Sequence, residues 1–248
     1  MNKPLYLRGF WRDDNLHFDS IGHLKDNSLP VSFALSGFEL KKVHLKQDKL
    51  ILDGRRVGLE FKDNKPLRIP LNAGKPTNPT DEPIHIEIDA SSVGDYGPAL
   101  DTVFVEDLAK LAPSLPFYWK SYASKELIPA TTTSNPSETP VTTQQNPSTP
   151  SQQPKRIGGS ITPPKLLKAK EPDFNDVARS LKYSGISLIH FWLKPDGTVT
   201  NLSILRPLGL GLDERALAAV QQYTFSPAME NGKPVLVELN VEVNFQIY

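Results

Sequence analysis

The chain has 248 residues, a formal net charge of zero, no cysteine and a hydrophobic share of 38%. This length allows two modest domains, and the low hydrophobic share predicts that part of the chain lies outside any core. The balanced charge disfavours nucleic acid as a partner, and the absence of cysteine excludes disulfides and thiolate chemistry.

Residues 1–128 are predicted to form a strand-rich α+β domain. Strand-like runs lie at 31–35, 38–45, 49–52, 55–61 and 84–88. Asp53 and Gly54 stand between two of these runs, which predicts a hairpin turn there. A single helix is predicted from apolar residues at helical spacing, namely Leu100, Val103, Phe104, Leu108 and Leu111. The aromatic run at 117–119 is expected to pack on the sheet.

Residues 129–155 consist largely of Pro, Ser, Thr and Gln. Such a segment has too few apolar side chains to offset the entropy lost on ordering, so we predict a disordered linker. Two folded units joined by this tether are therefore expected.

Residues 156–248 predict a second α+β domain. A helix is expected around 174–181, followed by strands at 186–194 and 198–206 that are joined by the turn Pro195–Gly197. Asp213 is the expected N-cap of a second helix. Leu217 in that helix and Phe225 after it are predicted to be buried between the helix and the sheet. The chain ends in one long alternating strand at 235–248. The order helix, strand, strand, helix, strand predicts two helices against a three-stranded antiparallel sheet.

Candidate catalytic and metal-binding residues do not form a recognisable pattern. The five histidines lack the spacing of a metal motif, and no nucleophile elbow or phosphate-binding loop is present. His17 and Asp19 could share a strand face with His44 or His85, but a structural role is favoured for each. We predict no enzymatic activity, no catalytic residue, no cofactor and no metal; an unrecognised enzyme in residues 1–128 is the alternative.

Several short motifs of the second half occur in the same order in a known family. They are Pro163–Leu166, Glu171–Phe174, Pro195–Gly197, Gly211–Glu214, Phe225–Ala228 and Gly232–Val235, and the alternating strand follows them. This arrangement resembles the C-terminal domain of the TonB family over about residues 156–248. Asn175 stands where the family usually has a second proline, and asparagine is compatible with a helix start.

The resemblance implies a periplasmic protein of a Gram-negative-type bacterium that couples or assists energy-dependent outer-membrane transport. Its expected partners are an outer-membrane transporter or another periplasmic protein, and inner-membrane motor proteins if an anchor exists. The sequence as written has no apolar signal region and no run of about 18 apolar residues. We therefore expect either an anchor in a precursor segment absent from this sequence or a family member that works without an anchor. The alternative is a periplasmic scaffold module that binds proteins without transducing energy.

The resemblance also implies a binding site on the last strand. The corresponding strand in TonB-like proteins pairs with a short transporter segment, and an unpaired strand edge can accept another chain. The predicted partner-binding residues are Val235, Leu236, Val237, Glu238, Leu239, Asn240, Val241, Glu242, Val243, Asn244 and Phe245.

Overall fold

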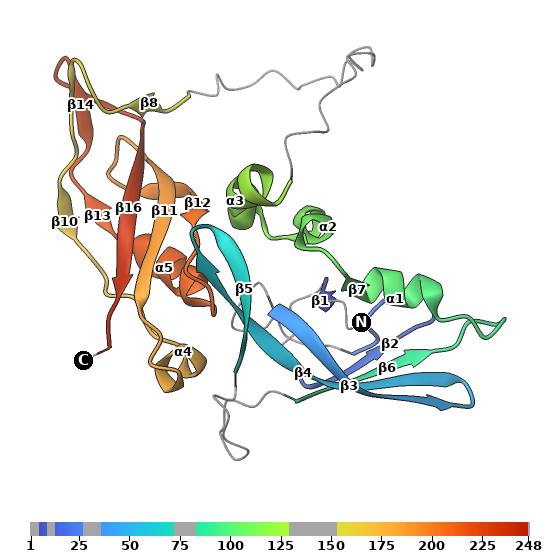
Figure 1. Ribbon diagram of the computed structural model, residues 1–248. Coiled ribbons are helices and arrows are strands. Elements are labelled where there is room, and N and C mark those ends of the chain that lie inside the picture. Colours follow the sequence, from blue (N-terminus) through green and yellow to red (C-terminus); the bar gives the residue numbers. More distant parts are fainter. Residues whose placement is uncertain (1–4, 9–12, 27–35, 72–82, 129–152, 248) are drawn as a thin grey trace, which may run out of the picture.

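The computed structural model describes residues 5–8, 13–26, 36–71, 83–128 and 153–247. They form an N-terminal part (5–128) and a C-terminal part (153–247), which lie side by side (Figure 1). Each part combines strands with short helices, so the predicted α+β class is confirmed. The predicted strand at 31–35 and most of the predicted linker lie outside the described residues. No helix of the described ranges is long and apolar enough to cross a membrane.

The N-terminal part is built on a seven-stranded sheet with the order β2-β6-β4-β3-β1-β7, in which β5 pairs with β4. Only the β2–β6 pair is parallel among the described strands of this sheet. The strands are β1 (Leu5–Leu7), β2 (Asn15–Phe18), β3 (Ser36–Lys46), β4 (Lys49–Lys62), β5 (Lys65–Pro70), β6 (Pro83–Asp89) and β7 (Phe104–Val105). Ile84, Ile86 and Ile88 of β6 are buried, as their alternation predicts.

The predicted hairpin turn at Asp53–Gly54 is wrong. Both residues lie inside the continuous strand β4, and the chain reverses instead after Lys46. Gly54 is needed there because a side chain would meet the ring of Phe38 at 2.5 Å and the carbonyl oxygen of Glu39 at 2.5 Å. The glycine therefore marks a close approach inside the sheet and not a turn.

The single helix predicted across 100–111 is interrupted. Phe104 is extended, with φ −119° and ψ 156°, and pairs with Leu7 of β1. Val103, Phe104 and Val105 are all buried, and one helix face cannot bury three consecutive residues, whereas a short strand in the sheet can. The helical segments are α1 (Gly97–Val103), α2 (Leu108–Leu111), η1 (Ala112–Ser114), η2 (Phe117–Trp119), α3 (Lys120–Tyr122) and η3 (Ala123–Leu127).

The C-terminal part has the predicted core of two helices and three antiparallel strands. Its main sheet has the order β12-β11-β16-β8, in which the two-residue strand β8 is an unpredicted parallel addition. Two small sheets, β10-β13 and β15-β14-β9, accompany it. The elements are β8 (Lys155–Arg156), β9 (Ile161–Thr162), β10 (Leu166–Lys168), α4 (Asp176–Ser180), β11 (Gly185–Leu193), β12 (Val199–Arg206), α5 (Leu212–Val220), β13 (Thr224–Phe225), β14 (Ala228–Glu230), β15 (Lys233–Val235) and β16 (Val237–Phe245).

The two parts meet through one continuous hydrophobic core. Trp119, 1% exposed, lies beside α5 and donates a hydrogen bond from Nε1 to Glu214 Oε1 at 2.9 Å. The loop before α5 also lies along β4, where the amide of Leu210 donates to the carbonyl of Leu59 at 3.0 Å. We expected two separate units joined by a tether. In the structure the N-terminal and C-terminal parts are in contact through this core. The domain boundary at 129–155 stays a prediction.

Candidate partner-binding edge

The strand β16 has the predicted buried and wet faces. Val237, Val243 and Phe245 are almost fully buried, and Leu239 and Val241 are half-buried against the same core. Asn240, Glu242 and Asn244, which alternate with them, are exposed, and Glu238 is partly exposed. The strand thus contributes side chains to the core from one face only.

The alternating run does not form one uninterrupted strand. Val235 belongs to β15 and pairs with Ala228, and Leu236 lies between β15 and β16. Val237–Phe245 are the predicted partner-binding residues that share one strand. Phe225, predicted to be buried, is half-buried, and its ring centroid lies 5.6 Å from that of Phe191. Leu217 is also half-buried.

One edge of β16 is fully paired and the other is largely open. On one side, β11 pairs with every residue from Val237 to Phe245. On the other side, β8 pairs only with Val237 and Glu238. Within the part of the chain that the structure describes, residues 239–245 have no strand on this second side. Their unpaired backbone groups can accept an added strand.

The opposite edge of the sheet is occupied by the N-terminal part. The segments η2 and α3 pack against β12, on the side away from β11 (Figure 1). An added strand at β12 would collide with these helical turns. The geometry therefore leaves β16 as the accessible edge among the described strands of this sheet.

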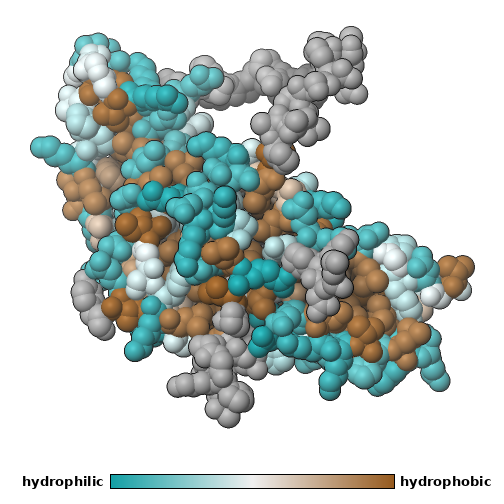
Figure 2. All heavy atoms as spheres, viewed as in Figure 1, coloured by the Kyte–Doolittle hydropathy of each residue, from teal (hydrophilic) through white to brown (hydrophobic). Residues whose placement is uncertain are grey.

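The wet face of the sheet combines polar pairs with apolar side chains, since Ile186, Leu188 and Trp192 of β11 lie opposite Asn244, Glu242 and Glu238 of β16. Arg156 Nε lies 2.7 Å from Glu238 Oε1, and Arg206 on β12 lies 2.9 Å from Glu242. His190 Nδ1 is 2.9 Å from Asn240 Oδ1. In Figure 2 the surface in this region mixes hydrophilic and apolar residues. Glu238, Asn240 and Glu242 belong to the edge strand β16, whereas Arg206 reaches Glu242 from β12, two strands away.

Comparison with known proteins identifies this part of the chain. A family model described as "Gram-negative bacterial TonB protein C-terminal" matches residues 170–247. Residues 170–247 are a TonB C-terminal domain.

The domain is similar to Protein TonB of Vibrio cholerae serotype O1 (strain ATCC 39315 / El Tor Inaba N16961), with 28% identity over 89 residues. That match covers 35% of this chain and 36% of the relative, so the chain spans about a third of the length of the curated relative. A similar solved structure is the solution NMR structure of the Pseudomonas aeruginosa TonB C-terminal domain. It has 20% identity and a TM-score of 0.29, with coverage of 36% of this chain and 89% of that one.

The helix α5 of the TonB C-terminal domain starts differently from the prediction. Its N-cap is Gly211, at φ 73°, and the predicted cap Asp213 lies inside the first turn. The fully buried carboxylate of Asp213 accepts hydrogen bonds from the amides of Leu208 (2.8 Å) and Gly209 (2.7 Å), and from Ser187 Oγ (2.6 Å). Burial raises the pKa of Asp213 to about 6, and these donors offset part of the rise. Asp213 thereby joins α5, the preceding loop and β11.

The first helix of the TonB C-terminal domain starts at the residue that departs from the family pattern. Asn175 is the N-cap of α4, and its Oδ1 accepts a hydrogen bond from the amide of Ala178 at 2.8 Å. Its Nδ2 donates to the carbonyl of Leu210 at 2.6 Å. Asparagine therefore performs the capping role expected of it and also ties α4 to the loop that docks on β4.

The histidines of the N-terminal part pair with carboxylates. His17 Nε2 lies 2.7 Å from Asp89, and His85 Nδ1 lies 2.6 Å from Asp53. The same Asp53 is 3.9 Å from His44. Asp19 accepts hydrogen bonds from the amides of Ile21 and His23, and its Oδ2 lies 3.5 Å from His23 Nδ1. In the described ranges, His, Asp and Glu form no group of three or more that could hold a metal ion.

Sequence reasoning missed two features at the edges of the sheet β12-β11-β16-β8. The strand β8 is only two residues long, and a pair of residues has no periodicity that could reveal a strand. The packing of η2 on β12 was also missed, although the aromatic run Phe117–Trp119 was singled out. An aromatic cluster indicates burial but does not reveal its partner surface.

Proposed function

We propose that this chain is a TonB-type periplasmic protein that binds an extended segment of an outer-membrane transporter along β16. Through that contact it would couple or assist transport driven by inner-membrane energy, with motor proteins as further partners if a membrane anchor exists. The observation that carries the proposal is the open edge at residues 239–245 in a TonB C-terminal domain.

The physical basis is strand addition. An extended segment gains backbone hydrogen bonds along the edge, each worth only about 0.5–1.5 kcal/mol net. Binding is therefore expected to be weak for a short isolated peptide. Specificity would come from Asn240, Glu242 and Asn244, whose side chains are exposed beside the edge.

The test is an NMR titration of the full chain with peptides copied from the N-terminal segments of outer-membrane transporters of the same cell. Amide shifts should concentrate in residues 239–245. Shifts confined to the helices, or none at millimolar peptide for all candidates, would reject the proposal.

N-methylated peptides provide a matched control that leaves the protein unchanged. In an added strand, alternate amides face β16 and the others face away. Methylating one alternate set should abolish binding, and methylating the other set should leave it nearly intact. Equal effects of both sets would argue against strand addition.

The second candidate is a scaffold module that uses the same domain without transducing energy. It is favoured by the docking of the TonB C-terminal domain on the chain's own N-terminal part through Trp119 and Glu214. Transport assays in cells that lack this protein discriminate the two. If adding the protein back restores transport, and a protonophore that removes the inner-membrane gradient abolishes the restored transport, transduction is favoured, provided that the transporter itself needs no gradient.

A further inference from the structure

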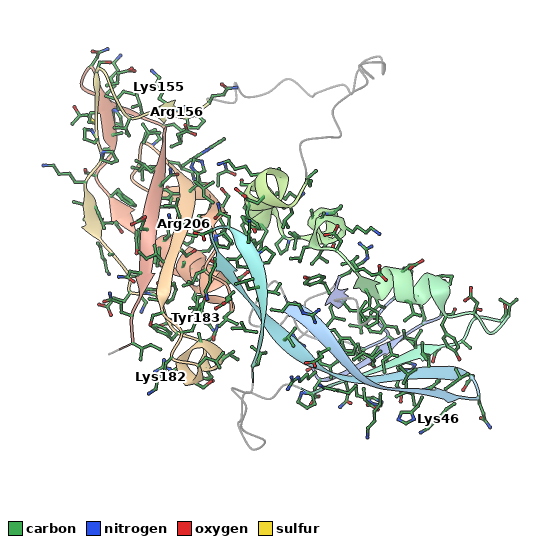
Figure 3. The ribbon with its side chains drawn as sticks, in the orientation of Figure 1. Lys46, Lys155, Arg156, Lys182, Tyr183 and Arg206 are labelled. Carbon is green, nitrogen blue, oxygen red and sulfur yellow. The ribbon has the colours of Figure 1, made fainter. Side chains whose placement is uncertain are left out.

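The strand β8 lies on the edge where the proposed partner would bind. Lys155 and Arg156 pair in parallel with Val237 and Glu238, and the amide of Lys155 donates to the carbonyl of Leu236 at 3.0 Å. Figure 3 shows both side chains at this end of the sheet. The chain's own segment therefore occupies two of the nine positions of β16.

The side chains that hold β8 are largely in water. Lys155 Nζ lies 2.5 Å from Glu230, and the Lys155 side chain is 51% exposed. Arg156, which pairs with Glu238, is 89% exposed. The partner carboxylates of Glu230 and Glu238 are 24% and 27% exposed, but the two cations stay hydrated, so these ion pairs hold β8 only weakly and salt screens them further.

The chain that follows β8 is loosely packed. It turns through Gly158 and Gly159, where an added side chain would meet no atom within 4 Å. The next buried side chain is that of Ile161, 9% exposed, in β9. Between β8 and Ile161, the half-buried Ile157 is the side chain that packs against the core, so release of Lys155 and Arg156 from β16 disturbs at most this partial contact.

We propose that β8 is a displaceable strand that competes with the partner segment for the first two positions of β16. The inference rests on the proposed function. A partner that pairs with residues 239–245 alone leaves β8 in place, whereas one that spans 237–245 must release it. Release breaks the backbone hydrogen bonds of β8, and the partner strand forms new ones in their place. The net free energy of the exchange therefore depends on the ion pairs of Lys155 and Arg156, which the partner does not replace.

The test compares two peptide lengths on two versions of the full chain. The probes are a nine-residue transporter-derived peptide and its two seven-residue forms, each shortened by two residues at one end. The variant K155Q/R156Q weakens β8, and K168Q/K182Q removes the same charge from exposed sites on β10 and after α4. The dissociation constants are measured by NMR titration.

The K155Q/R156Q variant should bind the nine-residue peptide about three- to tenfold more tightly than the unmodified chain does, which is a gain of up to one tenfold step in the equilibrium constant. The seven-residue form that avoids β8 should bind both versions equally, and K168Q/K182Q should behave like the unmodified chain. At saturation with the long peptide, the Lys155 amide should lose its protection from hydrogen exchange.

The possible failures are distinguishable. Equal affinity of the long peptide for K155Q/R156Q and for the unmodified chain, with Lys155 still protected, would overturn the competition and leave strand addition standing. A gain of the same size for all peptide lengths would also overturn it. Absence of binding by every peptide to both versions would overturn the proposed function and this inference with it.

Discussion

At the scale of single residues, Asp213 has more influence on the fold than its sequence position indicates. Its two carboxylate oxygens serve three donors from a loop and a strand, inside a site with no exposure to water. An ordinary N-cap serves its own helix, whereas this aspartate holds the loop 208–211 in the shape that docks on β4.

Replacement of Asp213 by asparagine should destabilise the chain by roughly 1–3 kcal/mol, the cost of leaving buried donors unpaired. The new amide would turn an N–H group toward at least one of the existing N–H or O–H donors. Urea denaturation of the full chain measures the loss, with the exposed Asp173→Asn as control. A loss no larger than that of the control would show that the three hydrogen bonds contribute little.

A second residue-scale prediction concerns pH. The hydrogen bond to Asp53 raises the pKa of His85 above its usual 6.5. Because the pKa is raised in the folded state, the stabilisation by protonated His85 is complete below about pH 6.5 and is lost as the pH rises through the folded value. Asp53→Asn should lower the His85 pKa and flatten this dependence.

An NMR titration of the His85 ring protons measures that pKa directly. Asp63→Asn, in an exposed turn between β4 and β5, is the control that should leave the titration unchanged. An unchanged midpoint in Asp53→Asn would contradict the role given to the hydrogen bond.

At the scale of elements, burial along the apolar alternation of β16 stops at Phe245, the last residue of the strand. Phe245 is 0% exposed and its ring meets that of Phe174 edge to face, with centroids 5.3 Å apart. Phe245→Ala should therefore cost about 3–5 kcal/mol in denaturant unfolding. Ile247, two residues later in the same alternation, is 37% exposed, and Ile247→Ala should cost less than about 1 kcal/mol. Similar losses in both variants would mean that the core extends past the end of the strand.

The elements also show which features the sequence could predict. The strands β11, β12 and β16 were predicted because apolar runs, the alternation at 235–248 and the Pro195–Gly197 turn are local signals. The interruption at Phe104 was not predicted, since it depends on pairing with Leu7, nearly a hundred residues earlier. The open edge of β16 was expected from strand order, but the presence of β8 depends on the Lys155 amide reaching Leu236, a contact that no local pattern encodes.

At the scale of the whole molecule, the docking of the two parts depends on a close backbone approach at Gly209. This residue has φ 101°, and a side chain there would lie 2.2 Å from the carbonyl oxygen of Leu59. Gly209→Ala should loosen the docking, so that the amides of Leu210 and Phe61, which donate across the interface, exchange hydrogen much faster.

Gly232→Ala is the matched control for this prediction. Gly232 also has a positive φ, 76°, but nothing lies within 4 Å of an added side chain. It shares the backbone strain without the clash, and the exchange of Leu210 and Phe61 should be unchanged. If both variants exchanged alike, strain in the chain and not the contact with β4 would be responsible.

The docked arrangement has a consequence for how strong the interface must be. Ile128 and Gln153 end the two docked parts and belong to one chain, so each part experiences the other at an effective concentration that for a short tether is about millimolar. Doubling the number of residues between them would raise the entropic cost of closure by only about 0.6 kcal/mol. The contacts at Trp119 and Gly209 therefore need only modest strength to keep the two parts together, and after each opening they re-form without a search through solution.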